Sequence, residues 1–333
     1  MHTYLIKKSQ VAKVLDMNSC IESVETAFRL YGLRKVQMPA KSYLIFDDYN
    51  GDTRSMPAYI PDFPIAGIKA VNVHPDNYKI DLPTVMATIL LIDPKNGFPI
   101  ALIDGTLITN MRTGAAGGVA AKYLANKNIE VAGFVGAGKQ AQTQYDAMMI
   151  VHPEIRKIKV FDINKEHSES FAQYCTSGFK VEVEIAESIS GAVTGCGIVN
   201  TTTSSRRPLF DSSVVSPGTH INAIGADAEG KQELSASILK KAVLVIDDWT
   251  QASHSGEINV PLHMGEITKD DIDSELGEII IGKKDGRRSE NDITVFDSTG
   301  LALQDIVTAW DVYNRLIKNE EYRSELPVVN FLD

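Results

Sequence analysis

The sequence has few cysteines and no long apolar run. Cys20, Cys175 and Cys196 lie far apart and form no C-x-x-C pair, which excludes a disulfide framework and a cysteine zinc site and fits a reducing cytoplasm. The longest apolar stretch, near Val85–Ile92, is far too short to span a bilayer. Met1–Gln10 lacks the apolar core of a signal peptide. We therefore expect a soluble, cytoplasmic protein without a membrane partner.

Basic residues are also in short supply. The chain has 33 Lys and Arg against 43 Asp and Glu, a formal net charge of −10, and it contains no basic run. This balance argues against a nucleic-acid partner. The histidines form no H-x-x-x-H or H-x-x-E-H pattern, so we expect no metal. The 333 residues have room for two domains, at roughly 150 residues each.

One stretch is more informative than any other. Val131–Val135 is typical of a buried strand, Gly136-Ala-Gly138-Lys-Gln-Ala141 follows it, and Gln142–Ile150 favours a helix. This is the G-x-G-x-x-A dinucleotide fingerprint in its strand–turn–helix setting. Gly136 would allow the tight turn and Gly138 the approach of a pyrophosphate, while the helix N-terminus offers N–H groups to the phosphates. The stretch predicts a dinucleotide-binding Rossmann domain.

The second strand of that domain indicates which dinucleotide is bound. Ile158–Ile163 is strand-like and carries Asp162 near its end. A carboxylate there accepts hydrogen bonds from the ribose 2′-hydroxyl and repels a 2′-phosphate. No arginine follows directly to hold such a phosphate, although Lys165 is near. We predict NAD rather than NADP as the cofactor.

Two patterns divide the chain. From Ile129 to about Phe296, strand-like and helix-like segments alternate, which is typical of a doubly wound parallel sheet. Before that, a helix-like start at Val11–Leu33 leads into strand-like pieces with hairpin signals at Asn50-Gly51 and Asn96-Gly97. We predict an α/β fold in which a Rossmann sheet (residues 113–299) is inserted into a split α+β substrate domain (residues 1–112 and 300–333). The strand-like pieces are Lys41–Phe46, Thr53–Tyr59, Ile65–His74, Thr84–Asp93 and Pro99–Asp104, and a helix over Leu301–Lys318 closes the chain.

Lys69 interrupts the apolar strand Ile65–Val73. A long charged side chain is almost never fully buried unless it is paired. One interpretation is an edge-strand lysine whose ammonium reaches water. The other is a lysine in a dry pocket, where desolvation lowers its pKa and suits it to act as a base or an electrostatic clamp.

Two further charged residues have a structural and a functional interpretation each. Asp227 follows a strand, at the edge of an open sheet where ligands bind, but it could equally form an Asx turn or cap a helix near Glu233. Thr109 or Asn110 could cap a glycine-rich helix that packs closely on another element, with Arg112 in its first turn. A cation there is unfavourable for the helix dipole, so Arg112 is suited to gripping a carboxylate or a pyrophosphate.

Taken together, the chain resembles the ornithine cyclodeaminase/μ-crystallin family over essentially its whole length. The matching stretches are Ser55–Ala58, Gly67–Pro75, Leu82–Met86, Met111–Ala116, Gly136–Ala141, Asn222–Asp227, Gly230-Lys231 and Val295–Gly300. The resemblance implies a homodimer built through the split domain, with the NAD domain inserted. It implies Lys69 as the active-site lysine, Asp227 as the acid/base carboxylate, and Lys41 and Arg112 as substrate-carboxylate ligands. The residues expected at the dinucleotide are Thr84, Arg112, Thr113, Gly136, Gly138, Lys139, Gln140, Asp162, Thr201, Thr202, Asn222, Ala223, Ile224, Gly225, Lys231 and Ser298.

One departure from the family's pattern bears on the substrate. Cyclodeaminases carry a glutamate two residues before the Met-Pro pair, where this chain has Arg54. A cation there repels the δ-amine of ornithine and, with Lys41, resembles the alanine dehydrogenase branch. We therefore expect an NAD-dependent oxidoreductase of amino-acid metabolism, acting on alanine or a related amino acid or 2-oxo acid, with Arg54 as a third carboxylate ligand. A cyclodeaminase with catalytic NAD, a ketimine reductase and a non-catalytic dinucleotide-binding protein are the alternatives.

Overall fold

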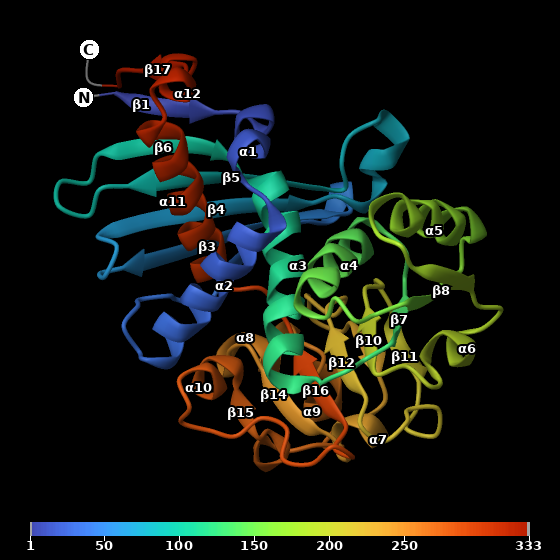
Figure 1. Cartoon of the computed structure of the whole chain (residues 1–333). Coiled ribbons are helices and arrows are strands. Elements are labelled where there is room, and N and C mark those ends of the chain that lie inside the picture. Colours follow the sequence, from blue (N-terminus) through green and yellow to red (C-terminus); the bar gives the residue numbers. More distant parts are fainter. Residues whose placement is uncertain (1, 332–333) are drawn as a thin grey trace. The chain divides into compact units, whose positions relative to one another are not determined.

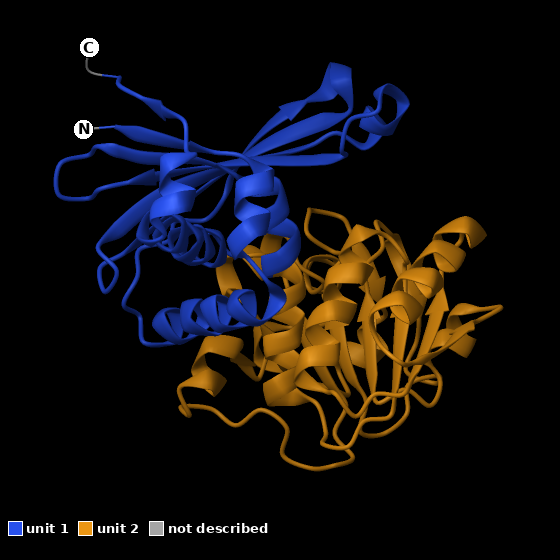
Figure 2. Cartoon of the chain, turned by 45° about the horizontal axis from the view of Figure 1, so that its top comes forward, with its two compact units in different colours: residues 1–112, 301–333 blue, residues 113–300 orange. Residues whose placement is uncertain are grey.

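The computed structural model describes residues 2–331. The chain divides into two compact units, drawn in separate colours in Figure 2. Unit 1 comprises Met1–Arg112 and Leu301–Asp333, and unit 2 comprises Thr113–Gly300. Figure 1 labels most of the helices and strands of both. Within residues 2–331, no helix is long and apolar enough to cross a membrane.

Unit 1 is built on a largely antiparallel sheet. Its strands follow the order β17-β1-β6-β5-β4-β3-β2, in which β1 and β6 run parallel and the other neighbours antiparallel. The five strands expected between residues 41 and 104 are confirmed. The short β1 and β17 were not expected. The bounds are β1 (Thr3–Ile6), β2 (Ser42–Phe46), β3 (Gly51–Ile60), β4 (Ile65–Val73), β5 (Val85–Ile92), β6 (Pro99–Asp104) and β17 (Val328–Val329).

Both hairpin signals lie at turns of this sheet. The short helix η1 (Asp47–Tyr49) joins β2 to β3 and ends at Asn50, which has a left-handed φ of 45°. Gly97, with a φ of 76°, lies in the turn between β5 and β6. Asparagine and glycine are the residues that adopt this conformation at least cost, so the turns follow directly from the sequence. A further short helix, η2 (Pro75–Ile80), joins β4 to β5.

Helices of unit 1 pack on this sheet. The single helix expected over Val11–Leu33 is instead two, α1 (Lys8–Val14) and α2 (Met17–Gly32), because Asp16 caps a new helix by accepting a hydrogen bond from the Ser19 N–H at 2.8 Å. The last long helix, α11 (Ala302–Lys318), packs against α2 and strands β3, β4 and β5, and α12 (Glu320–Ser324) follows it. A side chain at Gly67 would lie 2.7 Å from Ile306 Cδ1, so glycine permits this close approach.

Unit 2 contains the expected doubly wound parallel sheet, with strand order β15-β14-β16-β12-β10-β7-β8-β9. Alternating residues of its strands pack into separate cores on the two faces. Ala132 and Phe134 of β7 belong to a core with residues of α4 and α5, whereas Val135 belongs to one with residues of α6, α7 and α8. The bounds are β7 (Val131–Val135), β8 (Lys157–Phe161), β9 (Glu182–Ile185), β10 (Ile198–Thr201), β12 (His220–Ala223), β14 (Val243–Ile246), β15 (Ser274–Glu275), β16 (Thr294–Asp297), α4 (Lys139–Val151), α5 (Lys165–Gly178), α6 (Ile189–Val193), α7 (Ala236–Leu239), α8 (Trp249–Ser255), α9 (Asn259–His263), η3 (Lys269–Asp271) and α10 (Leu276–Ile280).

The glycine-rich helix begins earlier than the sequence suggested. Helix α3 (Gly105–Leu124) starts after Asp104, whose carboxylate accepts hydrogen bonds from the Thr106 and Leu107 N–H groups at 3.4 and 3.1 Å. Capping by Thr109 or Asn110 was therefore wrong, and both lie inside the helix. The expected close packing is confirmed, because a side chain at Gly114 would overlap the backbone of Thr143 on α4.

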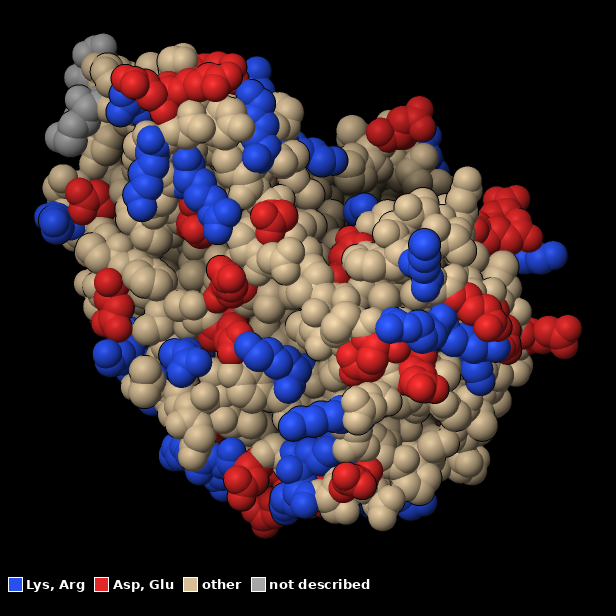
Figure 3. All heavy atoms as spheres, viewed as in Figure 1, with Lys and Arg blue, Asp and Glu red and all other residues tan. Residues whose placement is uncertain are grey.

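A second correction concerns the segment after Asp227. Instead of a helix near Glu233, the chain forms β13 (Gln232–Leu234), which pairs in parallel with β11 (Arg206–Phe210). Glu233 is fully buried in this strand. Acidic and basic side chains are intermixed over the face drawn in Figure 3.

Candidate active site

Lys69 lies at the centre of the unit 1 sheet. Its strand β4 is flanked by β3 and β5, and the side chain is fully buried among its cross-strand neighbours Met56 and Ile89. The edge-strand interpretation is therefore wrong. The Lys69 ammonium lies 2.6 Å from a carboxylate oxygen of Asp305 on α11. Burial, aided by the nearby Arg112 guanidinium and opposed by Asp305, lowers the pKa of Lys69 to about 7.

Arg112 reaches the same carboxylate from α3. It lies eight residues into the helix rather than in the first turn, so the helix-dipole argument for its role was wrong. Its Nε donates to Asp305 at 2.9 Å and one terminal nitrogen donates to Gln304 Oε1 at 3.1 Å. Lys69, Arg112 and Asp305 thus form one buried cluster inside unit 1. Asp305 escaped the sequence reasoning, although it is an acidic residue among Leu303, Ile306 and Val307 on an apolar helix face.

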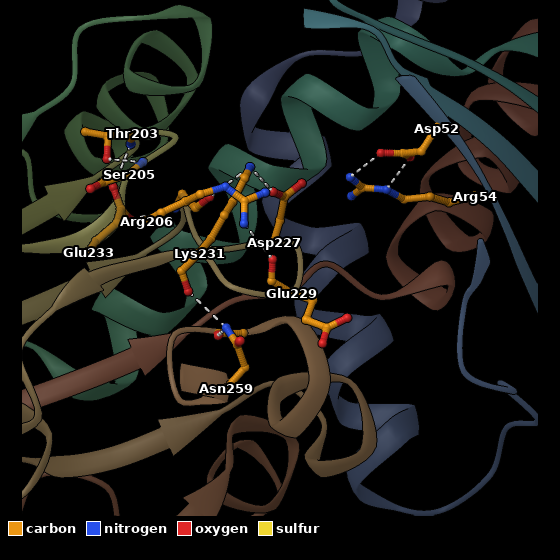
Figure 4. Close-up of polar contacts among 12 residues, drawn as sticks. Asp52, Arg54, Thr203, Ser205, Arg206, Asp227, Glu229, Lys231, Glu233 and Asn259 are labelled. Atoms are coloured by element: carbon orange, nitrogen blue, oxygen red, sulfur yellow. Dashed lines mark hydrogen bonds and ion pairs between the residues drawn. The ribbon is translucent and has the colours of Figure 1, made fainter. Parts of the chain in front are cut away.

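Arg54 and Lys41 occupy neighbouring parts of the same sheet. Arg54 on β3 is only 6% exposed. It donates to both carboxylate oxygens of Asp52, at 2.8 and 3.2 Å, an arrangement drawn in Figure 4. Its guanidinium also lies over the Tyr43 ring, 5.3 Å from the centroid. Lys41 is half-buried just before β2, and its charge contributes to the lowered pKa of Lys69. Thr84 is exposed just before β5.

The glycine loop of unit 2 has the form that the fingerprint predicts. Gly136 has a left-handed φ of 93°, and a side chain there would lie 3.0 Å from Thr202 Oγ1. The Ala137 N–H donates to Asp162 at 2.8 Å, which ties the loop to the end of the next strand. Helix α4 then begins at Lys139, and Gly138 at its N-cap supplies no capping side chain. The N–H groups at this helix end are positioned to bind an anion.

A cavity opens beside this loop. It has a volume of about 490 Å³ and combines apolar walls, hydroxyl groups and one carboxylate. Ile163, whose side chain is 95% exposed, forms part of one wall. Gly136, Gly138, Asp162 and Thr202 line this cavity, as do Ile189, Thr203 and Leu209. Four of the residues expected at the dinucleotide are thus brought together.

Two other residues expected at the dinucleotide, Thr201 and Asn222, use their side chains in hydrogen bonds inside unit 2. Thr201 is fully buried and its hydroxyl donates to Glu233 at 2.7 Å. Asn222 is fully buried too, and its amide donates to the Gly117 and Asn200 oxygens at 3.2 and 3.0 Å. These side chains therefore join core hydrogen-bond networks. Most of the remaining expected residues lie at the ends of strands and helices. Ala223 is the last residue of β12 and is followed by Ile224 and Gly225, and the buried Ser298 follows β16. Lys139 and Gln140 are the first residues of α4, and the Thr113 carbonyl accepts a hydrogen bond from Gln144.

Two buried glutamates that sequence reasoning missed hold the strand ends in place. Glu233 accepts hydrogen bonds from the Thr203 and Gly225 N–H groups, at 2.6 and 2.8 Å, besides the Thr201 hydroxyl. Glu257 accepts from the N–H groups of Glu233 and Leu234. Burial raises the pKa of Glu233, and burial together with the Glu233 charge raises the pKa of Glu257 well above its usual range. Nothing in their local sequence distinguishes these residues from surface glutamates.

Asp227 lies in the loop between β12 and β13, and Lys231 is its ion-pair partner. The Lys231 ammonium donates to the Asp227 carboxylate at 2.6 Å, as Figure 4 shows. Asn259 holds the end of this loop, because its side chain accepts from the Gly230 N–H and donates to the Lys231 carbonyl at 3.0 and 2.9 Å. Among residues 2–331, no group of three or more His, Cys, Asp or Glu is placed to hold a metal ion.

The parallel sheet and its glycine loop define a Rossmann-type α/β protein. The chain belongs to the ornithine cyclodeaminase/mu-crystallin family, whose model matches residues 1–320. It is 48% identical over 321 residues to an alanine dehydrogenase of Archaeoglobus fulgidus, covering 96% of this chain and 97% of the relative.

Two solved structures extend the comparison. One is an archaeal alanine dehydrogenase dimer with bound NAD, which is 45% identical with a TM-score of 0.93, covering 100% of both chains. The other is the Thermococcus litoralis Delta(1)-pyrroline-2-carboxylate reductase in complex with NADH and L-proline. It is 38% identical with a TM-score of 0.92, covering 95% of this chain and 98% of that one.

Proposed function

We propose that the protein is an NAD-dependent alanine dehydrogenase, converting alanine, NAD and water to pyruvate, ammonia and NADH, and that it acts as a homodimer in the cytoplasm. In this proposal unit 1 is the substrate and dimerisation domain and unit 2 is the NAD-binding domain. The 48% identity to an alanine dehydrogenase, over 96% of the chain, supports the reaction. The dimer with bound NAD among the similar structures supports the assembly and the cofactor.

The observation that carries the proposal is the buried charge of unit 1. Lys69 and Arg112 are two buried cations that share one carboxylate, Asp305. Buried charges are costly unless they are compensated, so the excess positive charge favours an anionic ligand. The α-carboxylate of an amino acid or a 2-oxo acid meets this requirement. Arg54 adds a guanidinium held by Asp52, where a diamino-acid enzyme would carry an acid to bind the second amine.

The residues of unit 2 fit the proposed cofactor. A left-handed glycine, a helix N-terminus without a capping side chain and the Asp162 carboxylate surround one cavity. These groups suit a pyrophosphate and a ribose with a free 2′-hydroxyl. When bound, NAD supplies the acceptor for the hydride that leaves the substrate Cα.

The remaining steps belong to side chains of the protein. Lys41, Arg54 and Arg112 bind the substrate carboxylate and orient Cα. Loss of the hydride leaves an imine, and Asp227 removes a proton from the water molecule that attacks it. Lys69, whose pKa of about 7 lets it take up or release a proton near neutrality, stabilises the developing charge and returns a proton to the leaving ammonia. In the opposite direction, the same groups aminate pyruvate reductively.

The direct test is to mix the purified protein with NADH, ammonium and a panel of 2-oxo acids headed by pyruvate. Loss of absorbance at 340 nm with pyruvate, dependent on ammonium, is the expected result. A flat trace with every 2-oxo acid, together with release of ammonia from ornithine without net change in NADH, would contradict the proposal. That outcome would make the protein a cyclodeaminase and the interpretation of Arg54 wrong.

A second candidate is a cyclic ketimine reductase, supported by the 38% identity to a Delta(1)-pyrroline-2-carboxylate reductase. Its substrate also carries a carboxylate next to the carbon that receives hydride, so the same cations would bind it. The two reactions differ in their need for ammonia. Consumption of NADH with pyrroline-2-carboxylate in the absence of ammonium, and none with pyruvate in its presence, would favour the reductase.

A further inference from the structure

Asp305 connects three segments of unit 1 that lie far apart in the sequence. It is fully buried near the start of α11. One carboxylate oxygen lies 2.6 Å from the Lys69 ammonium on β4, and the other accepts from Arg112 Nε on α3 at 2.9 Å. The carboxylate is therefore the counter-ion of two cations that reach it from different elements.

The surroundings of this carboxylate strengthen its effect. The neighbours of Lys69 on the adjacent strands, Met56 and Ile89, are apolar. The charges of Arg112 and Lys41 lower the pKa of Lys69, and the charge of Asp305 opposes them. Gln304 accepts from Arg112 at 3.1 Å and from the Leu301 N–H at 3.3 Å. In a dry environment the position and charge of each group depend strongly on the others.

We propose that Asp305 is a positioning residue that favours the protonated form of Lys69 and fixes the Arg112 guanidinium for binding of the substrate carboxylate. The inference deepens the proposed function, since it assigns to Asp305 the control of a lysine that the reaction uses. Asp305 acts through Lys69 and Arg112 rather than on the substrate itself.

The arrangement of charges predicts that replacing Asp305 and replacing Arg112 shift the pKa of Lys69 in opposite directions. An opposite charge within about 4–6 Å favours the charged form of a group by roughly 1–3 pKa units, and a like charge disfavours it. Replacing Asp305 by a neutral residue should therefore lower the pKa of Lys69, and replacing Arg112 should raise it. General loosening of the fold has a different signature, because hydration moves the pKa of Lys69 upward from about 7 toward the ordinary 10.5 in both variants.

The test is a titration of Lys69 in the full chain by NMR. The protein is labelled with 13C at the lysine ε carbon, and the Lys69 resonance is identified by its loss in Lys69→Arg. We expect Asp305→Asn to lower the pKa by about 1–3 units and Arg112→Gln to raise it. The matched control is Asp311→Asn on the same helix, where Asp311 pairs with Arg315 at 2.8 Å, and it should leave Lys69 unchanged. An unchanged or raised pKa in Asp305→Asn would overturn the proposal.

Folding of the variant supplies a second check. Should Asp305→Asn fail to fold, the cost of burying Lys69 without its counter-ion is the expected reason, and adding Lys69→Met should restore folding. Failure of that double variant would mean that Asp305 acts as a structural residue, which also overturns the proposal. The conservative variant Asp305→Glu keeps the charge and should keep the Lys69 pKa close to that of the unaltered protein.

The reaction itself gives an independent readout. If protonated Lys69 is needed for reductive amination, kcat/KM for pyruvate falls as pH rises through the pKa of Lys69. This alkaline limb should move to lower pH in Asp305→Asn by the same 1–3 units. If the alkaline limb of kcat/KM stays at the same pH in Asp305→Asn although the pKa of Lys69 has changed, Lys69 protonation does not control the reaction. The NMR titration needs no substrate, so it decides the role of Asp305 even where the unaltered protein turns over no 2-oxo acid.

Discussion

The two units treat buried ionisable groups in different ways. In unit 1 the buried cationic side chains of Lys69 and Arg112 lie against the carboxylate of Asp305. In unit 2 the buried His220 and Glu233 are hydrogen-bonded to uncharged groups, and burial lowers the pKa of His220 to about 3 and raises that of Glu233. The cations that we propose to bind the substrate carboxylate lose stability by their burial. A scaffold that only positions a backbone loop needs no such cations.

Replacement of Lys69 by Met tests the unit 1 side of this comparison and should have the largest effect. In the proposed mechanism it removes both the proton carrier and the charge that stabilises the transition state. Because general acid–base and electrostatic contributions are each worth about 10²–10³-fold or more, kcat should fall by at least about 10⁴-fold. Steady-state kinetics with pyruvate and ammonium measure this, and NADH binding followed by fluorescence is the control that should be unaffected. Turnover within tenfold of normal would remove Lys69 from the mechanism.

Replacement of Asp227 by Asn applies the same test to unit 2, where this half-buried carboxylate is expected to take part in catalysis. The change keeps the shape but removes the proposed base that activates water, so kcat should fall by about 10²–10⁴-fold. NADH affinity should stay within a few-fold, as the glycine loop lies elsewhere in unit 2. As a control, Asp211→Asn alters an exposed carboxylate of unit 2 and should leave kcat unchanged. Normal turnover in Asp227→Asn would contradict its assignment as the base.

The comparison also explains what the sequence could predict. The glycine loop is local: Gly136, Gly138 and the following helix are consecutive in the chain, so their pattern alone indicated both the Rossmann fold and its binding function. Most strands of both units followed from apolar runs and turn residues in the same way, whereas β1, β11, β13, β15 and β17 were not expected. These features depend on neighbouring residues, and local physics determines them.

The charged cluster of unit 1 could be predicted only in part. Lys69, Arg112 and Asp305 lie on separate elements, so each appears in the sequence as an isolated charge. Lys69 stood out because it interrupts an apolar strand, but its partner could be found only once the chain had folded. The sequence placed the start of α3 too late. Its capping residue, Asp104, is the last residue of a predicted strand, so it was not considered as a helix cap.

Replacement of His220 by Gln tests whether this buried imidazole of unit 2 stays uncharged in the folded protein. The buried imidazole lies within hydrogen-bond distance of Thr294 and Asn222, at 2.9 and 3.0 Å, and Arg287 and His152 also disfavour its charge. Its folded pKa of about 3 lies below the ordinary 6.5. The unfolded chain therefore binds more protons between these values, and stability is lost as pH falls through this window.

This loss amounts to about 1.4 kcal/mol per pH unit and should be missing in His220→Gln. Urea unfolding at pH 6, 5 and 4 gives the free energy of unfolding of both proteins. The loss is measured as the difference between their slopes of this free energy against pH. His254→Gln is the matched control, because His254 is exposed on α8 of the same unit and should leave the slope unaltered. Equal slopes for His220→Gln and the unaltered protein would mean that His220 is protonated in the folded state.

Replacement of Asp162 by Asn should have the smallest effect, and it tests the prediction that a charge of unit 2 repels the 2′-phosphate of NADPH. The Asp162 carboxylate accepts from the Ala137 and Asn164 N–H groups, both at 2.8 Å, which fixes it in the cavity beside the glycine loop. Two unit charges about 4 Å apart in water repel by roughly 1 kcal/mol, so the preference for NADH over NADPH should shrink by about fivefold. The ratio of the dissociation constants for NADPH and NADH measures this preference. Asp211→Asn is the control and should leave the ratio unchanged. Equal affinities for the two dinucleotides in the unaltered protein would show that Asp162 does not discriminate between them.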